Sequence, residues 1–250
     1  MKEKVVQYLI SLGDNPLILG QRLGEWCGHG PVLEVDMALT NIALDLLGQT
    51  RSYFQHAAAL EDQGRSEDDI AFLRDARAFR NVLLVEQPNG NFADTLARQF
   101  FFDAWHLLFL EQLQHSQDEQ LAAIAAKSLK EVRYHLRFSS EWLIRLGDGT
   151  PESHEKMQQA VDDLWMYTGE LCSPTALDRE MAELGIGVDL PALKPAWDAQ
   201  VESVLKEATL AIPAPEWQQN GGKNGLHTEE LGFILADLQW LQRAYPGAKW

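Results

Sequence analysis

Apolar residues recur along the chain at a helical spacing of three and four positions, and the long Val, Ile and Thr alternations typical of strands are missing. Clusters of Gly, Pro and Asn interrupt this pattern and mark the ends of the expected helices. Four segments are long enough for the helices of a bundle: 32–61, 91–116, 118–146 and 151–171. Shorter helices are expected at 4–12, 16–28, 67–80, 176–184, 191–210 and 227–244. The pattern predicts an all-α fold.

The chain shows no change in composition that would mark a linker between domains. The most loop-like stretch, residues 213–225, is too short to connect two domains of any size. We therefore expect one helical domain over residues 1–250, because helices bury their apolar faces most simply against one another. Its core bundle is expected at roughly 32–171 and a C-terminal helical extension at 172–250.

Asp103 interrupts an apolar row of the helix expected over 91–116, whose other members are Leu96, Phe100, Leu107 and Leu110. A buried carboxylate must be paired, hydrogen-bonded or bound to a metal. His106 lies one turn further on the same side, so Asp103-x-x-His106 could present two metal ligands on one face. A hydrogen-bonded core Asp beside a His that bonds a neighbouring helix is the alternative.

Two other polar residues raise the same question. His135 lies in the middle of the inward row of the helix expected over 118–146, where a lone His is more often a hydrogen-bonded core residue than a ligand. Glu25 lies beside Trp26 and Cys27 in the short helix that precedes segment 32–61. Its spacing leaves open whether it is buried and paired or an exposed first-turn charge.

Composition and charge narrow the class of protein. Hydrophobic residues make up 46% of the chain, enough to bury a sizeable core. The formal net charge of −16 argues against nucleic-acid binding and against docking on anionic lipid, since both need a positive surface. No apolar run is long enough for a transmembrane helix, and the N-terminus lacks the pattern of a signal peptide. The only cysteines, Cys27 and Cys172, are too few for a disulfide framework, so a cytoplasmic location is expected.

Two features could contact a ligand or a partner. The loop Gly221–Gly225 has the composition of a phosphate loop without its residue order; with Lys223 and His227 it could hold a phosphate group or part of a partner. The alternative is a turn that caps the C-terminal helix. Trp217 and Trp250 are expected to be exposed anchors for a partner, or else to pack on their own subunit.

The chain resembles the phenylacetyl-CoA oxygenase (epoxidase) subunits of the ferritin-like superfamily, and among them the non-catalytic C type. Four segments carry the resemblance: LGDNPLILGQRLGEWCGHGP, LLVEQPNGNFADTLARQF, LKEVRYHLRFSSEWLIRLGDGT and GGKNGLHTEELG. The resemblance implies a ferritin-like four-helix bundle with additional short helices. It also implies a structural subunit that binds and stabilises the di-iron catalytic A subunit during aerobic phenylacetate degradation.

In such a complex, one oxygen atom of O2 is inserted into the aromatic ring of phenylacetyl-CoA to form a ring 1,2-epoxide. The resemblance implies that the di-iron cofactor belongs to the catalytic partner. It also implies a further small subunit and a separate NADPH-dependent flavin/iron–sulfur reductase that supplies electrons.

The ligand pattern of the catalytic relatives resembles the usual ferritin-like set, with one carboxylate from each of two helices and an E-x-x-H from each of two others. On this pattern Glu25, Asp103 and His135 remain, whereas ligands are lost at Leu46, Gln49 and Val132. A slip of register would bring Asp45 into the set. The resemblance therefore implies that this chain has no metal site, cofactor site or catalytic residue.

Two alternatives stay open. The chain could be a ferritin-like oxidase with a reduced metal site at Glu25, Asp103 and His135, joined by His106, since two carboxylates and one His resemble a facial triad by count. Bound iron would distinguish this possibility. It could instead be a CoA-binding module that uses the Gly221–Gly225 loop, and saturable binding of CoA would be its sign.

Overall fold

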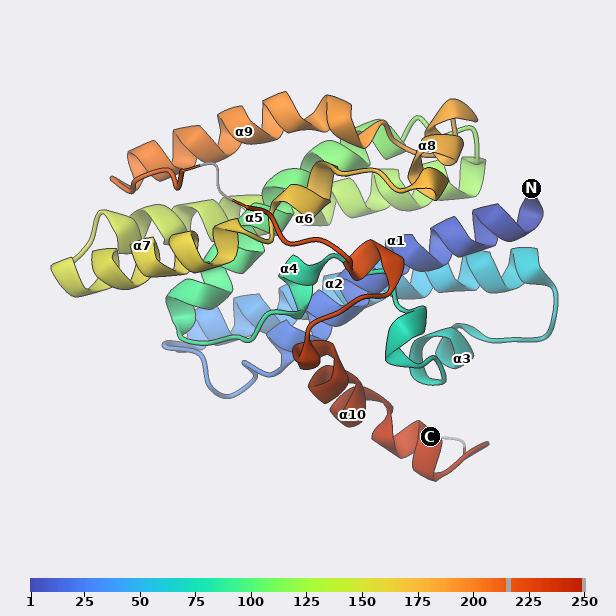
Figure 1. Ribbon diagram of the computed structural model, residues 1–250. Coiled ribbons are helices and arrows are strands. Elements are labelled where there is room, and N and C mark those ends of the chain that lie inside the picture. The colour runs from blue at the N-terminus through green and yellow to red at the C-terminus, as the bar shows by residue number, and fades with distance from the viewer. Residues whose placement is uncertain (215–216, 249–250) are drawn as a thin grey trace. The chain divides into compact units, whose positions relative to one another are not determined.

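The structure is a computed structural model that describes residues 1–214 and 217–248 (Figure 1). Within these residues all the regular elements are helices, which confirms the all-α class. The chain forms two compact units, each described here by itself. Unit 1 combines Met1–Glu86 with the part of the chain from Gly221 onward, and unit 2 is Gln87–Asn220. The organisation as a single domain stays a prediction.

Unit 1 is built on a pair of long helices that lie side by side, α1 and α2 (Figure 1). The C-terminal helix α10 also belongs to this unit and packs against α1, α3 and α4. The elements are α1 (Lys2–Gly24), α2 (Leu33–Glu61), α3 (Glu67–Phe72), η1 (Ala76–Ala78), α4 (Leu83–Glu86), η3 (Gly222–Asn224) and α10 (Glu229–Ala244).

α1 is one continuous helix, whereas the sequence pattern predicts two helices at 4–12 and 16–28. The prediction is wrong because Pro16 lies inside the helix without ending it. The helix is stabilised by its packing on α2, and the Phe54 ring of α2 lies so close to Gly13 that a Cβ there would overlap it. The Thr50 hydroxyl of α2 also donates to the Gly13 carbonyl at 3.2 Å.

Unit 2 is centred on α5, which packs against α6, α7 and α9. Its elements are α5 (Phe92–Leu113), α6 (Glu119–Gly147), α7 (Pro151–Trp165), η2 (Gly169–Cys172), α8 (Ala176–Glu183) and α9 (Leu190–Glu207). Asn91 and Thr150 cap α5 and α7 through side-chain hydrogen bonds to the first turn. Each unit thus contains one pair of long helices that pack on each other, α1/α2 in unit 1 and α5/α6 in unit 2.

Two further boundaries differ from the predicted ones. The segment 67–80 divides into α3 and η1, because the Arg74 guanidinium between them bonds the carbonyls of Ile70 and Ala78 in place of a continuous helix. The helix predicted over 151–171 ends at Trp165 and is followed by η2, so α1 replaces it among the four longest helices. In the part of the chain that the structure describes, no helix combines the length and apolar character needed to cross a membrane.

Candidate functional site

Asp103 is fully buried on α5 and is held by two neutral hydrogen-bond donors. Gln99, one turn earlier on the same helix, donates through Nε2 to Asp103 Oδ1 at 2.7 Å. Ser139 of α6 donates through Oγ to Asp103 Oδ2 at 2.8 Å. Each carboxyl oxygen therefore has a protein partner, and the Ser139 contact ties α6 to α5.

The pKa of the Asp103 carboxyl is raised from 3.8 to about 7 because burial penalises its charged form. The charge of His135 and the hydrogen bonds from Ser139 and Gln99 lower this pKa, but they do not outweigh the burial. Near neutral pH the carboxyl is thus divided between its protonated and ionised forms. A metal ligand must be deprotonated, so such a carboxyl binds a cation only by giving up a tightly held proton.

His106 is buried on α5 one turn after Asp103 and is packed among aromatic rings. Its ring centroid lies 5.0 Å from that of Phe102 and 6.1 Å from that of Trp105. Burial, together with the charge of His135, lowers the pKa of His106 to about 3. Among the described residues its Nδ1 atom has no hydrogen-bond partner. At neutral pH His106 is therefore a neutral ring that packs as an aromatic residue.

His135 and Val132 are both fully buried on α6, one turn apart, as the inward row predicts. The charge of His135 acts on both Asp103 and His106, so unit 2 brings these three groups close together. The backbone carbonyl of His135 also accepts a hydrogen bond from Ser139 at 3.0 Å. The resulting cluster links two helices through a few short polar contacts inside an apolar core.

The other positions named by the resemblance lie in unit 1. Leu46 and Gln49 are buried on α2, with 0% and 2% of their surface exposed. Glu25 lies just beyond the end of α1, is exposed, and pairs with Arg22 at 3.3 Å between Nη1 and Oε1. It is therefore neither buried nor in a first turn. Asp45 is half-buried beside Leu46 on α2.

The donor chemistry of these positions is a poor match for two irons. Leu46 and Val132 offer only hydrocarbon, and Gln49 offers a neutral amide where an anionic or imidazole ligand is needed. Within residues 1–214 and 217–248, no three His, Cys, Asp or Glu side chains are grouped as metal ligands.

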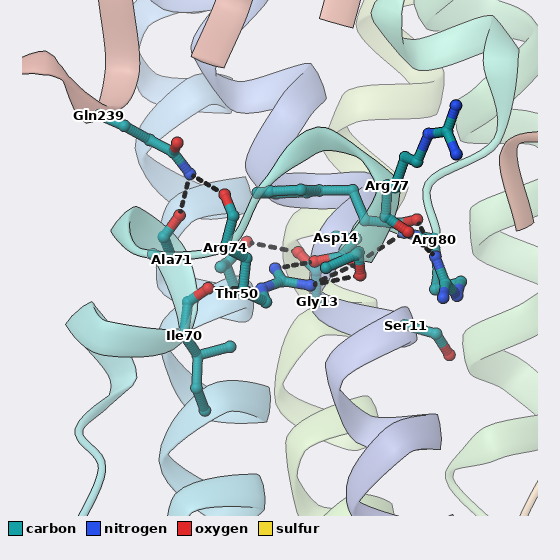
Figure 2. Close-up of polar contacts among 12 residues, drawn as sticks. Ser11, Gly13, Asp14, Thr50, Ile70, Ala71, Arg74, Arg77, Arg80 and Gln239 are labelled. Carbon is teal, nitrogen blue, oxygen red and sulfur yellow. Dashed lines mark hydrogen bonds and ion pairs between the residues drawn. The ribbon is translucent and has the colours of Figure 1, made fainter. Parts of the chain in front are cut away.

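Unit 1 contains a buried ion pair that the sequence did not reveal. The Asp14 carboxylate of α1 accepts hydrogen bonds from Arg74 Nη1 at 3.0 Å, from Arg74 Nη2 and from the backbone N–H of Arg80 at 2.8 Å (Figure 2). The Arg74 guanidinium also lies 4.1 Å from the centre of the Phe79 ring. Gln239 of α10 donates to the Ala71 and Arg74 carbonyls, so the same segment is held by the first and last helices of the chain.

Glu86 is the centre of a second buried group in unit 1. Its Oε1 accepts from the backbone N–H and the hydroxyl of Thr228 at 2.7 and 2.8 Å. Its Oε2 contacts Asn81 Nδ2 and His227 Nδ1, both at 2.8 Å. The other ring nitrogen of His227 lies 3.1 Å from the Phe79 carbonyl. Since the Glu86 carboxylate and the Phe79 carbonyl are both acceptors, both nitrogens of His227 donate, and its ring is a buried imidazolium.

The pKa of His227 agrees with that geometry. Burial alone lowers it, but the hydrogen bond and the charge of Glu86 outweigh the burial and raise the pKa above 6.5. Both ring nitrogens are already bonded within the protein, so His227 contributes no free donor to a phosphate. Asp14 and Arg74 are 60 positions apart and Glu86 and His227 are 141 apart, so periodicity could not pair them. Asp14, Glu86 and His227 lie in segments that carry the family resemblance, whereas Arg74 lies outside them.

The loop Gly221–Gly225 folds against its own unit. Its middle forms η3, and Gly225 has a φ of 79°. A Cβ at Gly225 would meet the Arg77 carbonyl and the Arg80 guanidinium, so only glycine fits there. Trp217 is 71% exposed, as expected, and Trp250 lies outside the described residues.

The whole chain, residues 1–250, matches a family model described as phenylacetic acid catabolic protein. A curated relative from Escherichia coli (strain K12), the C subunit of 1,2-phenylacetyl-CoA epoxidase, is 56% identical over 247 residues. That similarity covers 99% of this chain and 99% of the relative. On this combined sequence similarity, the chain belongs to the phenylacetic acid catabolic protein family.

Proposed function

We propose that this chain is the structural, non-catalytic subunit of a 1,2-phenylacetyl-CoA epoxidase, and that it binds and stabilises the di-iron catalytic subunit. The observation that carries the proposal is the 56% identity to the C subunit of the Escherichia coli epoxidase over nearly the full length of both chains.

The chemistry of the ligand positions supports a structural role. Two Fe(II) ions bring four positive charges and are usually bridged by Glu carboxylates. Hydrocarbon side chains at Leu46 and Val132 cannot replace such ligands. Of the two remaining carboxyls, Glu25 is exposed and pairs with Arg22, and the buried Asp103 is hydrogen-bonded to Gln99 and Ser139 and holds a proton up to about pH 7. The role of Asp103 in the proposal is to connect α5 and α6.

In the proposed complex the oxygen chemistry belongs to the catalytic partner. A flavin/iron–sulfur reductase supplies the electrons, and a further small subunit completes the assembly. We place the complex in the cytoplasm, because two cysteines, Cys27 and Cys172, are too few for a disulfide framework.

The test is to purify this chain alone and together with the catalytic subunit, and to measure iron, O2 consumption and phenylacetyl-CoA turnover with the reductase present. We expect iron and turnover in the pair and neither in the single chain. Stoichiometric iron and O2 consumption in the single chain would contradict the proposal and would favour an oxidase site at Asp103, His106 and His135. Saturable binding of CoA by the single chain would favour the CoA-binding alternative.

A further inference from the structure

Helix α2 carries a row of exposed apolar side chains on its outer side. Leu33, Met37, Leu44 and Leu47 are 70%, 56%, 61% and 36% exposed. With Thr40 between Met37 and Leu44, the row advances by alternate steps of four and three residues. We call these five residues the α2 outer row.

Most of the α2 outer row lies outside the face through which α2 joins the core of unit 1. That inner face is formed by Val35, Leu39, Ile42 and Leu46, which are 2% exposed or less. Leu47, at the end of the row, also lies beside Gly20 of α1. The solvent side of a helix in a globular protein is normally polar, so apolar residues on both sides indicate that a second surface is to be covered. Alternate steps of four and three are the spacing with which one helix receives the side chains of another.

The charges beside the α2 outer row indicate what covers it. Glu34, Asp36 and Asp45 lie between Leu33 and Thr50, and this stretch contains no Lys or Arg. Asp36 is already used as a cap, since its Oδ2 accepts from the backbone N–H groups of Gly28 and Gly30 at 2.8 and 2.9 Å. An acidic border favours a partner helix whose flanks carry Lys or Arg. A second copy of this chain is disfavoured because each copy carries a net charge of −16.

We infer that the α2 outer row is the surface on which the catalytic subunit docks, through a helix with apolar residues at the same spacing and basic residues on its flanks. This inference rests on the proposed function, which supplies the identity of the partner. Leu44 is 61% exposed and has members of the row on both sides, Thr40 and Leu47, so we take it as the main anchor.

The test compares Leu44→Lys with Phe233→Lys in the full-length chain. Both residues are 61% exposed on a helix of unit 1, Leu44 on α2 and Phe233 on α10, so the two variants place the same charge on equally exposed apolar sites. Affinity for the purified catalytic subunit is measured by titration at fixed ionic strength. We expect Leu44→Lys to weaken the Kd by about 30-fold or more, as at an interface hot spot. Phe233→Lys is expected to bind as the wild-type chain does.

Two further variants keep the inference falsifiable if Leu44→Lys is lost to misfolding. Met37→Lys, one heptad before Leu44, is expected to weaken binding as well. Glu34→Lys is expected to slow association and to reduce its dependence on salt, because it replaces an acid that attracts the basic flank. Circular dichroism and thermal unfolding of each variant confirm that its fold is retained.

Each contrary result has its own meaning. If the wild-type chain does not bind the catalytic subunit, the proposed function fails and the docking surface fails with it. If the wild-type chain binds and Leu44→Lys and Met37→Lys bind equally well, only the docking surface is wrong. If the wild-type chain alone is a dimer by light scattering and Leu44→Lys is a monomer, the row is covered by a second copy, and the inference is overturned.

Discussion

Burial makes Asp103 a group that binds its proton more tightly in the folded chain than in the unfolded chain. Its folded pKa of about 7 lies above the unfolded value of 3.8. The stability that this group contributes is therefore fully present below about pH 4, and it is lost as the pH rises through about 7. Ionisation of Asp103 at higher pH puts a charge among neutral donors in the core.

Asp103→Asn is expected to remove this loss, because the amide carries no proton to release. Its oxygen can still accept from Gln99, and its NH2 group can donate to the Ser139 hydroxyl in place of the bond that the carboxyl accepted. Relative to the wild-type chain, the Tm of the variant should rise steadily from pH 5 to pH 8. The gain should be a few degrees, since about 1 kcal/mol corresponds to roughly 2–4 °C at this size. Thermal unfolding at several pH values measures it, with Asp148→Asn as an exposed control. Parallel pH profiles for wild type and Asp103→Asn would falsify the assignment.

His106 has the opposite dependence on pH. Its folded pKa of about 3 lies below the unfolded value of 6.5, so the stability that it contributes is present above pH 6.5 and is lost as the pH falls. His106→Leu removes a group that must charge on unfolding and fills an apolar environment. We expect the midpoint of acid unfolding to move to lower pH in this variant. An unchanged midpoint, with an unchanged Tm at pH 7, would show that His106 is not the acid-sensitive group.

At the scale of elements, the close approach of α1 and α2 depends on Gly13. Gly13→Ala adds a methyl group where the Phe54 ring already lies, and overpacking of this kind costs about 1–3 kcal/mol. Gly24→Ala is a suitable control because it lies in the same helix and a Cβ there meets nothing within 4 Å. Urea unfolding should therefore show Gly13→Ala to be less stable than wild type and Gly24→Ala to be equal or more stable. Equal loss in both variants would contradict the packing assigned to Gly13.

The C-terminal segment of unit 1 depends on the His227 imidazolium. The folded pKa of His227 is raised, so its contribution to stability is present below pH 6.5 and is lost as the pH rises through the folded pKa. His227→Leu leaves the Glu86 carboxylate and the Phe79 carbonyl without their shared donor. Hydrogen exchange should then accelerate in α10 at pH 7 while α6 in unit 2 keeps its protection. Unchanged exchange in α10 would show that the His227 contacts do not hold this helix.

The boundaries of α2 and α6 could be predicted from the sequence because both helices have a regular apolar period between clear breaks. The continuity of α1 could not, since Pro16 normally ends a helix and its tolerance depends on packing with α2. The burial of Asp103 and His135 followed from their rows. The sequence did not identify Gln99 and Ser139 as the hydrogen-bond partners of Asp103, although Gln99 lies four positions from Asp103 and Ser139 four positions from His135. A neutral polar side chain on an inward face carries no charge, so nothing in the sequence indicates that it must be paired.

The ion pairs Asp14–Arg74 and Glu86–His227 could not be predicted, since nothing local in the sequence links residues so far apart. They are fixed by tertiary packing, which places the segment 70–86 against α1 and the chain from Gly221 onward. Removing one member of a buried ion pair leaves the other charge buried without a partner, which is strongly destabilising. Each member of these pairs is therefore important for the stability of the fold.

At the scale of the whole molecule, the proposed role of the chain is to support chemistry in a partner, and the side chains of Leu46, Gln49 and Val132 are in keeping with that proposal. The polar residues that remain at the other aligned positions serve the fold in this account: Asp103 and Ser139 join two helices, and Glu25 pairs with Arg22. Their replacement should therefore change stability or assembly rather than the rate of the chemical step.

The most direct measurement is the turnover of complexes assembled with Asp103→Asn, His135→Gln and Glu25→Gln together in this chain. Turnover is normalised to the iron and to the amount of assembled complex, so that losses of assembly are counted separately. We expect kcat to equal that of the wild-type complex, because in the proposed role these residues contribute no ligand and no proton to the reaction. A complex that assembles with full iron and yet loses turnover would contradict the non-catalytic role of this chain.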